Sequence, residues 1–571
     1  MKKLTFIGLF ALLAGCNLAP HYERPATATP AAFKEAVPGN DSAGWRPAQP
    51  QDERMRSAWW GVYSDSELTT LEERVAGANQ SVIAAAATFR QARALVTEAR
   101  AAYYPTVGLA PSFTRSRTSV GAGGAGVSTG SSTSASGTTT SSGSTSGTST
   151  TSTTSTGSTA TTSGSSQAGV PHNLFILPIQ ASYEVDLWGS VRNTVNQNAA
   201  LASASAADWA NVLLMMQSEL AQDYFGLRAA DEQRRLLITT LDDYRASLKL
   251  VTTLFNSGLA SDEDVAEAEL QLANAQVQAT DLGITRAQYE HAIAVLVGVP
   301  PSKFSLVERP LVPQVPIIPL TVPSDLLERR PDVAGAERRV AAANAGIGIA
   351  RAAYYPTLTL SGTAGYESLS LSNLLDWPNR FWSVGPALAQ TLFDGGARRG
   401  QNAYAQAAYD DNVANYRQTV LSAFQSVEDS LINLRVLSDE ARQEHVAVLA
   451  AQRTVRLSVT RYKQGLDSYV NVITAQNAFL LARQGELQVQ LRALTQSVGL
   501  VKNLGGGWPD RKSREADPTH STPNAANPDP DSIPAPMNVA TPNPPPENLP
   551  NHKPDDLFNL DDTSSPAPVA H

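Results

Sequence analysis

The octapeptide ARAAYYPT occurs twice in this chain, at residues 99–106 and again at residues 350–357, 251 positions apart. In both copies an Ala- and Arg-rich run, whose composition favours a helix, ends at Tyr-Tyr-Pro. Because a residue before proline is disfavoured in the helical region, Pro105 and Pro356 should end the helix and start an extended segment. The stretch therefore predicts a helix-to-strand transition that the fold uses twice.

Extended segments of about 10–13 residues follow each octapeptide and precede Gly189 and Gly395, and they alternate between polar and apolar residues. The apolar sides are Val107, Leu109 and Phe113; Phe175, Leu177, Ile179, Tyr183, Val185 and Leu187; Leu358, Leu360, Ala364 and Tyr366; and Trp382, Val384, Leu388 and Leu392. Four such strands are long enough to cross a bilayer when tilted. A half-buried soluble sheet would alternate in the same way.

Four strands are too few to close a membrane barrel, whose smallest form has about eight. An open sheet would leave unpaired backbone groups in lipid. If these strands cross a membrane, the chain must pool them with copies of itself. We find no later run of about 20 apolar residues for a transmembrane helix, so strands are the expected route.

Two further landmarks repeat along the chain. DLWGSVR (186–192) matches LFDGGARR (392–399), with Gly189 against Gly395, and LFNSGLASDEDV (254–265) matches RYKQGLDSYVNV (461–472), with Gly258 against Gly465. These offsets of 206 and 207, against 251 for the octapeptide, indicate an insertion in the first half. We assign it to the Ser/Thr/Gly-rich segment 119–168, which cannot bury a core.

The repeat divides the chain into a first unit at 66–300, a linker at 301–323 and a second unit at 324–508. Each unit should contain a short helix (66–103, 324–354), a helix of about 65 residues (190–255, 397–463) and a shorter helix after a glycine turn (to 297, and 468–503). The long helices would each reach about 100 Å. Apolar residues at heptad spacing indicate a coiled coil; they are Leu237, Leu241, Tyr244, Leu248, Val251 and Phe255 in the first unit and Val448, Val455, Val459 and Tyr462 in the second.

The N-terminus, MKKLTFIGLFALLAGC, has two lysines, a short apolar run and small residues before the single cysteine, Cys16. This is the pattern of a signal peptide at 1–15 ending in a lipobox, with Cys16 as the lipidated residue of an anchored segment at 16–65. Acyl chains would add membrane affinity. Asn17 rather than Asp follows, as in lipoproteins sent to the outer membrane.

Composition argues against other classes. The net charge is −9, with no basic patch that would indicate a nucleic-acid partner. The seven histidines are scattered and none has metal-ligand spacing, so we expect no metal site and no cofactor beyond the covalent lipid on Cys16. We find no catalytic constellation and expect no enzyme. The Pro-rich tail at 509–571 should be disordered.

The chain resembles the TolC-like outer-membrane efflux protein family, in its OprM/NodT-type lipoprotein branch. The motifs that carry the resemblance are AWWGVYSDSELTTL (58–71), VPSDLLERRPDVAGAER (322–338), ANAGIGIARAAYYPTLTLSG (343–362), LFDGGARR, RYKQGLDSYVNVITAQ (461–476) and LGGGW (504–508). The resemblance implies an α+β membrane protein, a homotrimer in which four strands per chain form a 12-stranded β-barrel and long helices form a periplasmic α-barrel. It also implies docking to a periplasmic adaptor and to an inner-membrane resistance-nodulation-division transporter, and passive export of small compounds.

The family's gate lies at the periplasmic tip, just beyond the second glycine turn. By position this points to Val470 and Thr474 at the aperture, and to Tyr462, Asp467 and Asp264 as lock or selectivity residues. Many members carry Asp where this chain has Thr474. Asp264 also suits the start of any helix, where a carboxylate is favoured, and Tyr462 continues the heptad pattern.

Other roles stay open at this point. Gly258 and Gly465 should sit where long helices end and reverse, and Trp188, Trp377, Trp382 and Tyr366 suit an aromatic girdle or a core. A duct for type I protein secretion belongs to the same superfamily. A coiled-coil scaffold without a channel is the alternative of another class.

Overall fold

The computed structural model describes residues 17–27, 30, 33–35, 58–117, 171–311, 315–316 and 329–506. The predicted signal peptide, Cys16, the insert at 119–168, Trp508 and the tail lie outside these residues, as do much of the anchored segment and part of the linker. Contacts divide the chain into Met1–Asp510 and Arg511–His571. The first unit alone contains described residues.

The strands form one antiparallel sheet in the order β1-β3-β4-β5, with β2 also paired to β3. Their bounds are Thr106–Leu109 for β1, Ser112–Ser116 for β2, His172–Val185 for β3, Thr357–Ser368 for β4 and Arg380–Ala389 for β5. The first predicted strand is therefore interrupted, because Pro111 lacks the N–H that a strand residue donates. Since β1 and β2 share one side of β3, the sheet has four strand positions and two open edges within this chain.

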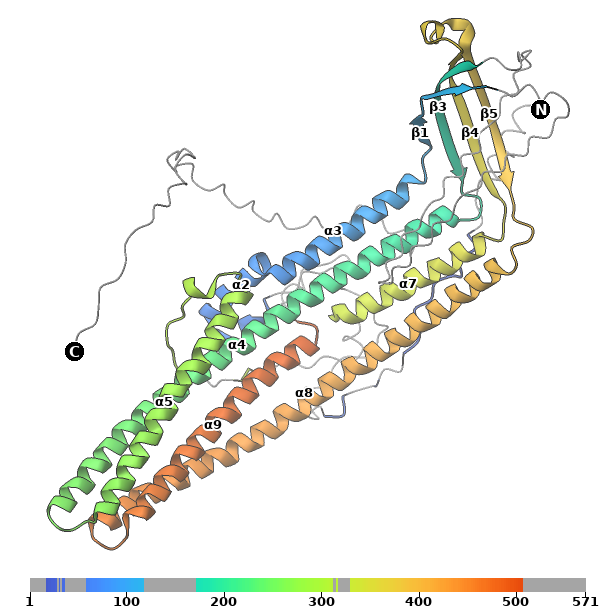
Figure 1. Cartoon of the computed structure of the whole chain (residues 1–571). Coiled ribbons are helices and arrows are strands. Elements are labelled where there is room, and N and C mark those ends of the chain that lie inside the picture. The colour runs from blue at the N-terminus through green and yellow to red at the C-terminus, as the bar shows by residue number, and fades with distance from the viewer. Residues whose placement is uncertain are drawn as a thin grey trace, which may run out of the picture. The chain divides into compact units, whose positions relative to one another are not determined.

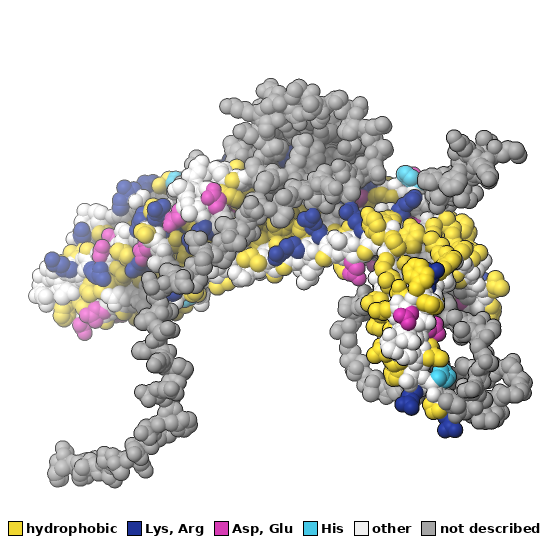
Figure 2. All heavy atoms as spheres, turned by 90° about the horizontal axis from the view of Figure 1, so that it is seen from above, with side chains coloured by type: hydrophobic (Ala, Val, Ile, Leu, Met, Phe, Trp, Pro, Cys, Tyr) yellow, Lys and Arg dark blue, Asp and Glu magenta, His cyan; other side chains and the backbone are white. Residues whose placement is uncertain are grey.

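One face of the sheet is apolar along all four positions. The register places Val107 beside Ala181, Tyr183 opposite Leu360, and Leu358 opposite Leu388. Many large apolar side chains on this face are exposed: Val107, Leu109, Phe113, Ile179, Trp382, Val384 and Leu388 each keep more than half of their surface accessible. Hydrophobic side chains cover much of this end of the molecule in Figure 2. The sheet thus shows the predicted two-sided alternation, and within the part of the chain that the structure describes much of its apolar face stays exposed.

Two long helices run away from the sheet, α4 (Ser190–Asn256) and α8 (Ala397–Lys463). Near the sheet they pack with α3 (Gln80–Ala101) and α7 (Pro331–Ala352), and near their far ends with α5 (Asp262–Leu296) and α9 (Tyr469–Asn503) (Figure 1). Of the predicted heptad residues, Leu237, Leu241, Tyr244, Val251 and Val448 are buried. The heptad pattern therefore marks the packing of each hairpin.

Corresponding helices of the two halves have equal lengths. α4 and α8 each span 67 residues, α5 and α9 each span 35, and α3 and α7 each span 22. The long helices start after Gly189 (φ 77°) and Gly396 (φ 97°). The match of Gly189 to Gly395 was therefore wrong by one residue, because Gly396 is the residue directly before its helix, as Gly189 is before α4.

The predicted helix at 66–103 is two helices, α2 (Ser66–Ala78) and α3, which was a further error. Asn79 separates them: its side-chain oxygen accepts from Ser81 N (2.9 Å) and Val82 N (3.2 Å), which caps α3. Its side-chain nitrogen donates to Leu296 O at the end of α5, 2.9 Å away. A local cap and a tertiary bond thus break a sequence whose propensity is helical throughout. The second predicted short helix starts at Pro331, and residues 321–328 are not described.

A buried ion network holds the segment after α5 against the helices. Arg228 and Asp231 are each 3% exposed at the side chain and lie 2.9 Å apart, and Asp231 also pairs with Arg286 at 2.8 Å. Arg286 donates to Leu306 O at 2.6 Å, and Leu306 N donates to Glu290 at 2.6 Å. The largest hydrophobic cluster surrounds the helices at the level of this ion network.

Short 3-10 turns lie at Trp59–Tyr63 (η1), Pro301–Lys303 (η3), Leu371–Asn373 (η4) and Trp377–Asn379 (η5).

One described helix, α4, contains a window long and apolar enough to cross a membrane by length and composition, of which 22% is buried. This differs from the expectation that no such stretch exists. At about 100 Å, α4 is far longer than a bilayer is thick. It packs with α3, α5, α7 and α9, so it lies among the other helices of the chain.

Candidate functional site at the hairpin tip

The two glycine turns lie next to each other at the end of the helices remote from the sheet (Figure 1). We call this region, residues 247–271 of α4 and α5 and 459–477 of α8 and α9, the hairpin tip. Gly258 and Gly465 have φ of 75° and 70°. In the first turn Leu259 N donates to Leu254 O at 2.9 Å, and in the second Leu466 N donates to Arg461 O at 2.9 Å. These bonds define the same glycine-terminated helix end in both hairpins, as predicted.

An apolar cluster joins the two hairpins. Its buried members are Val251 of α4, Ala268 of α5, and Tyr469 and Val472 of α9. Tyr462 of α8 packs on Tyr469, with ring centroids 5.2 Å apart. All four helices therefore meet at the tip, and Tyr462 contributes packing as its heptad position indicated.

The acidic residue nearest this cluster is Asp264. It forms a capping box with Ser261: Asp264 N donates to Ser261 Oγ at 3.2 Å, and Ser261 N donates to Asp264 Oδ2 at 3.4 Å. The carboxylate also affects the aromatic pair, since burial first and then its negative charge raise the pKa of Tyr462. Burial, with Tyr462 and Asp264 nearby, raises the pKa of Tyr469 to about 12. Asp264 thus starts its own helix and faces the other hairpin's tyrosines.

The hydroxyl of Tyr462 is buried and makes no hydrogen bond of normal geometry with the described residues. Since the ring stays protonated at neutral pH, this hydroxyl is an unused donor, and the carboxylate of Asp264 lies near enough to affect its pKa after burial, which is the larger cause.

Asp467 acts within its own hairpin. Its carboxylate accepts from the side chain of Asn471, from Ser468 N at 3.1 Å and from Arg461 Nε at 3.3 Å. The bond from Asn471, followed by that from Ser468 N and the nearby guanidinium, lowers the pKa of Asp467. The structure therefore places Asp467 at the α8–α9 turn and does not bring it to Asp264.

Val470 and Thr474 lie one turn apart on the exposed side of α9. Val470 is 50% exposed, and the hydroxyl of Thr474 donates to Val470 O at 2.8 Å. The buried residues Tyr469, Val472 and Gln476 follow the other side of the helix. The two predicted aperture residues thus share one exposed face of α9.

Sequence reasoning missed a polar link above the cluster. Gln271 and Asn477 exchange side-chain hydrogen bonds between α5 and α9, and Gln476 donates to Ser247 Oγ of α4 at 3.1 Å. Gln476 is 8% exposed and continues the buried side of α9. A polar residue within an otherwise apolar helix stripe was the available signal, because such residues fix helix register.

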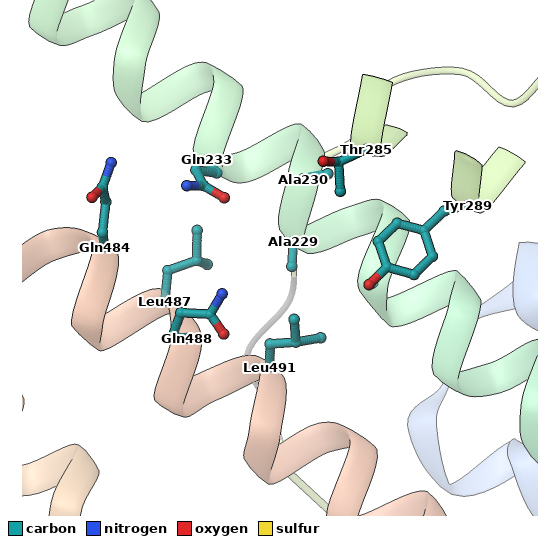
Figure 3. A pocket seen from close by; sticks show the side chains of 10 residues that line it. Ala229, Ala230, Gln233, Thr285, Tyr289, Gln484, Leu487, Gln488 and Leu491 are labelled. Carbon is teal, nitrogen blue, oxygen red and sulfur yellow. The ribbon is translucent and has the colours of Figure 1, made fainter. Parts of the chain in front are cut away.

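A small cavity of about 70 Å³ lies farther up, between α4, α5 and α9. Figure 3 shows Gln233, Gln484 and Gln488 around it, with Tyr289 at one side. The ring of Tyr289 lies so close to Gly226 that a Cβ there would meet it at 2.6 Å. Pockets for small molecules are usually 300 Å³ or larger, so this space suits helix packing with water rather than a bound compound. Among the described residues no group of His, Cys, Asp and Glu is arranged to hold a metal ion.

At the opposite end, the residue after Cys16 contacts the strand-to-helix junction. Asn17 Oδ1 accepts from Asn193 Nδ2 at 3.1 Å and lies beside Gly189. Trp188, which precedes that glycine, stacks on Tyr355 at 4.7 Å and donates to Pro356 O at 2.7 Å. Trp377 and Trp382 are 70% and 74% exposed, which rules out the core-packing alternative for these two.

Comparisons with known proteins agree with this arrangement. The chain is 28% identical over 512 residues to a toluene efflux pump outer membrane protein, TtgF, of Pseudomonas putida, covering 89% of this chain and 97% of that protein. It is 28% identical over 509 residues to the pyoverdine export outer membrane protein OpmQ of Pseudomonas aeruginosa, with the same coverage.

Solved structures give the same result. The outer-membrane channel OprN matches with a TM-score of 0.71 at 25% identity, over 86% of this chain and 100% of that one. The Campylobacter jejuni CmeC outer membrane channel matches with a TM-score of 0.70 at 19% identity, over 88% and 97%, which supports the fold. The outer membrane efflux protein family matches residues 72–299 and 322–506. The chain therefore belongs to the outer membrane efflux protein family.

Proposed function

We propose that this protein is the exit duct of a tripartite efflux pump, which passively conducts drugs or other small compounds from a periplasmic adaptor and an inner-membrane transporter to the outside. The observation that carries the proposal is the sheet: an exposed apolar face with two open edges, joined to helices of about 100 Å. Lipid would cover the apolar face, and the helices would reach toward the partners.

The open edges support a homotrimer. Unpaired backbone groups are not tolerated in lipid, so the β1/β2 edge of one copy and the β5 edge of the next must pair. Three copies of four strand positions give the 12-stranded barrel. The same symmetry would surround one axis with six long helices and six shorter ones from the hairpins, forming the periplasmic α-barrel.

The N-terminal segment supports a lipid anchor on Cys16. Asn17, the residue after Cys16, accepts a hydrogen bond from Asn193 at the base of the sheet. The Trp188 and Tyr355 stack lies at the same level, where aromatic side chains favour a membrane interface. Acyl chains on Cys16 would enter the membrane leaflet that faces the helices.

The hairpin tip supports a gate. Tyr462 and Asp264 place a donor and a carboxylate on different hairpins, and Val470 and Thr474 offer an exposed face for the aperture. Asp467 would act through the shape of the α8–α9 turn. Because Thr474 is neutral, the ring of Thr474 side chains in the proposed trimer would select permeating ions by charge less than a ring of carboxylates does.

Planar-bilayer recording of the full-length protein tests the proposal. We expect a trimer that resists SDS until heated, and discrete single channels after reconstitution. A monomer without channels would favour the coiled-coil scaffold and contradict the proposal. To distinguish small-compound efflux from type I protein secretion, we would pair the protein in cells with an inner-membrane transporter of each kind and measure export of a dye and of a protein.

A further inference from the structure

Three arginines lie at the end of the sheet that is remote from the helices. Arg115 is in β2, Arg117 follows that strand, and Arg380 begins β5. All three are exposed, and within the described ranges none of them forms an ion pair. The guanidinium of Arg380 stacks on Trp377, 3.7 Å from the ring centre. The outer end of the sheet therefore presents positive charge that has no ion-pair partner among the described residues.

Arg115 and Arg380 belong to the apolar face. Phe113 packs on Phe175 at 4.7 Å, and Arg115 is two residues farther along the same strand. Arg380 is opposite Tyr366 and two residues from Trp382, on the same side. A charge on a lipid-facing strand costs little only near the interface. Both positions fit the level of lipid headgroups.

β2 and β5 are on opposite edges of the sheet, so a single chain cannot bring these arginines together. The next step rests on the proposed trimer, in which the two edges meet at each subunit boundary. The internal repeat then predicts how β5 of one copy pairs with β2 of the next. Residues of α4 correspond to residues of α8 that are 207 positions later, and residues of α3 correspond to residues of α7 that are 251 positions later. The same offsets convert the pairing Leu358↔Leu388 into Val107↔Ala181, which is the pairing observed.

Applied to the β3–β4 pairing, the offsets predict the pairing between copies. Adding 207 to the β3 residue and subtracting 251 from the β4 residue converts the pair Leu177↔Tyr366 into Val384 opposite Arg115 of the next copy. In the same way, Phe175↔Ser368 gives Trp382 opposite Arg117 of the next copy. Arg380 is then the diagonal neighbour of that Arg117, a separation of about 7–8 Å that long side chains span. Arg117 and Arg380 of two copies are thus within reach of each other at each boundary, with Arg115 two residues from Arg117 on the same strand face.

A hollow of about 300 Å³ lies next to this cluster on the apolar face. Its lining includes Ala181, Gly362 and Ala364, which are small, with larger side chains from Ile179, Trp382 and Val384 around them. Of the acidic residues nearby, Glu367 alternates to the other face, and Asp376, in the loop before Trp377, forms no ion pair with a described residue. An acyl chain fits the hollow, and a phosphate fits the arginines.

We propose that each subunit boundary binds an anionic, phosphorylated lipid of the outer leaflet, with its phosphate on Arg380 and the neighbouring copy's Arg115 and Arg117, and an acyl chain in the hollow. Arginine forks bind phosphate oxygens in pairs. The lipid would span two copies and hold the boundary closed.

Native mass spectrometry of the full-length trimer, titrated with bis-phosphorylated lipid A, tests this. We expect up to three bound lipids, and at least tenfold weaker binding for the Arg115→Gln/Arg117→Gln/Arg380→Gln variant and for lipid A without phosphates. The control Arg453→Gln/Arg456→Gln, at exposed positions of α8, should bind as the wild type does. Equal binding by the triple variant, or full displacement by millimolar inorganic phosphate, would overturn the proposal.

The register is tested separately by disulfide trapping. Leu392→Cys with Val107→Cys should give covalent trimers on oxidation, whereas Leu392→Cys with Leu109→Cys should give few. Trapping of the second pair alone would overturn the predicted register. If the wild type is not trimeric, the proposed function fails; if it is trimeric and conducts but ignores the lipid phosphates, only the lipid site fails.

Discussion

Tyr462 at the end of α8 and Tyr469 at the start of α9 pack ring against ring across the Gly465 turn, with centroids 5.2 Å apart. Asp264 of the other hairpin lies close enough to raise the pKa of Tyr462. This relationship links the conformation of one hairpin to the position of the other. It is the structural basis for placing a lock at the hairpin tip.

Removing the lock should open the channel. Tyr462→Phe keeps the ring packing and removes the donor that faces Asp264, and Asp467→Ala loosens the turn that Arg461 and Asn471 tie together. We expect single-channel conductance or open probability to rise severalfold for each. Asp439→Ala, at an exposed position of α8, is the matched control. Wild-type conductance in both tip variants would exclude this role.

The glycine turns should resist substitution by a side chain. Nothing lies within 4 Å of a Cβ built at Gly465, so Gly465→Ala meets only the strain of its φ of 70°. We expect a loss of about 1 kcal/mol in stability. Gly283→Ala, also in open space but within α5 and without positive φ, should instead stabilise by about 0.5–1 kcal/mol. Thermal unfolding followed by circular dichroism compares the two, and equal shifts would contradict the account.

Glu72 should make stability depend on pH. It is fully buried in α2, and burial raises its pKa from 4.5 to about 9. The carboxyl is then neutral when folded and ionised when unfolded, so stability falls as pH rises from about 4.5 toward 9. The loss reaches about 3 kcal/mol at pH 7.

Glu72→Gln should therefore match the wild type near pH 4.5 and exceed its apparent melting temperature at pH 8. Glu73→Gln, at the exposed neighbouring position, should follow the wild type at both pH values. A wild-type melting temperature that does not fall between these pH values would show that Glu72 is not buried as a neutral acid.

The anchor on Cys16 predicts a defined mass. The purified protein should begin at residue 16 and carry acyl chains, and Cys16→Ala should lose metabolically incorporated palmitate. Intact mass spectrometry decides this, because Cys16 is the only cysteine in the chain. A mass that matches the unmodified chain from residue 1 would refute the lipobox interpretation.

Much of the fold followed from the sequence because its signals are local. Proline and glycine set the ends of α8 and the transition after Tyr355, and period-two alternation predicted the faces of β3, β4 and β5. The break at Asn79 was missed because half of its cause is a bond to Leu296, far along the chain. The misplaced Gly395 match has a similar reason: Gly395 and Gly396 both have positive φ, and which of them directly precedes the helix depends on where α8 starts.

The site was predicted less completely than the fold. Position alone brought Tyr462, Asp264 and Val470 to the tip, yet Tyr469 and the Gln271–Asn477 pair emerged only from the packing of one hairpin on the other. Contacts between helices remote in sequence depend on their rotation about their own axes. Heptad spacing gives the stripe that packs but does not give its partner.

The most direct test of the central claim, a duct whose aperture is lined by α9, is thiol modification of Thr474→Cys during single-channel recording. With Cys16 acylated, the new thiol is the only reactive one. The account predicts that a charged methanethiosulfonate reagent lowers conductance in steps and that reductant restores it, with Ala478→Cys, one turn farther along the same exposed side, affected less. Channels whose conductance is unchanged after complete modification of Thr474→Cys, confirmed by mass, would contradict it.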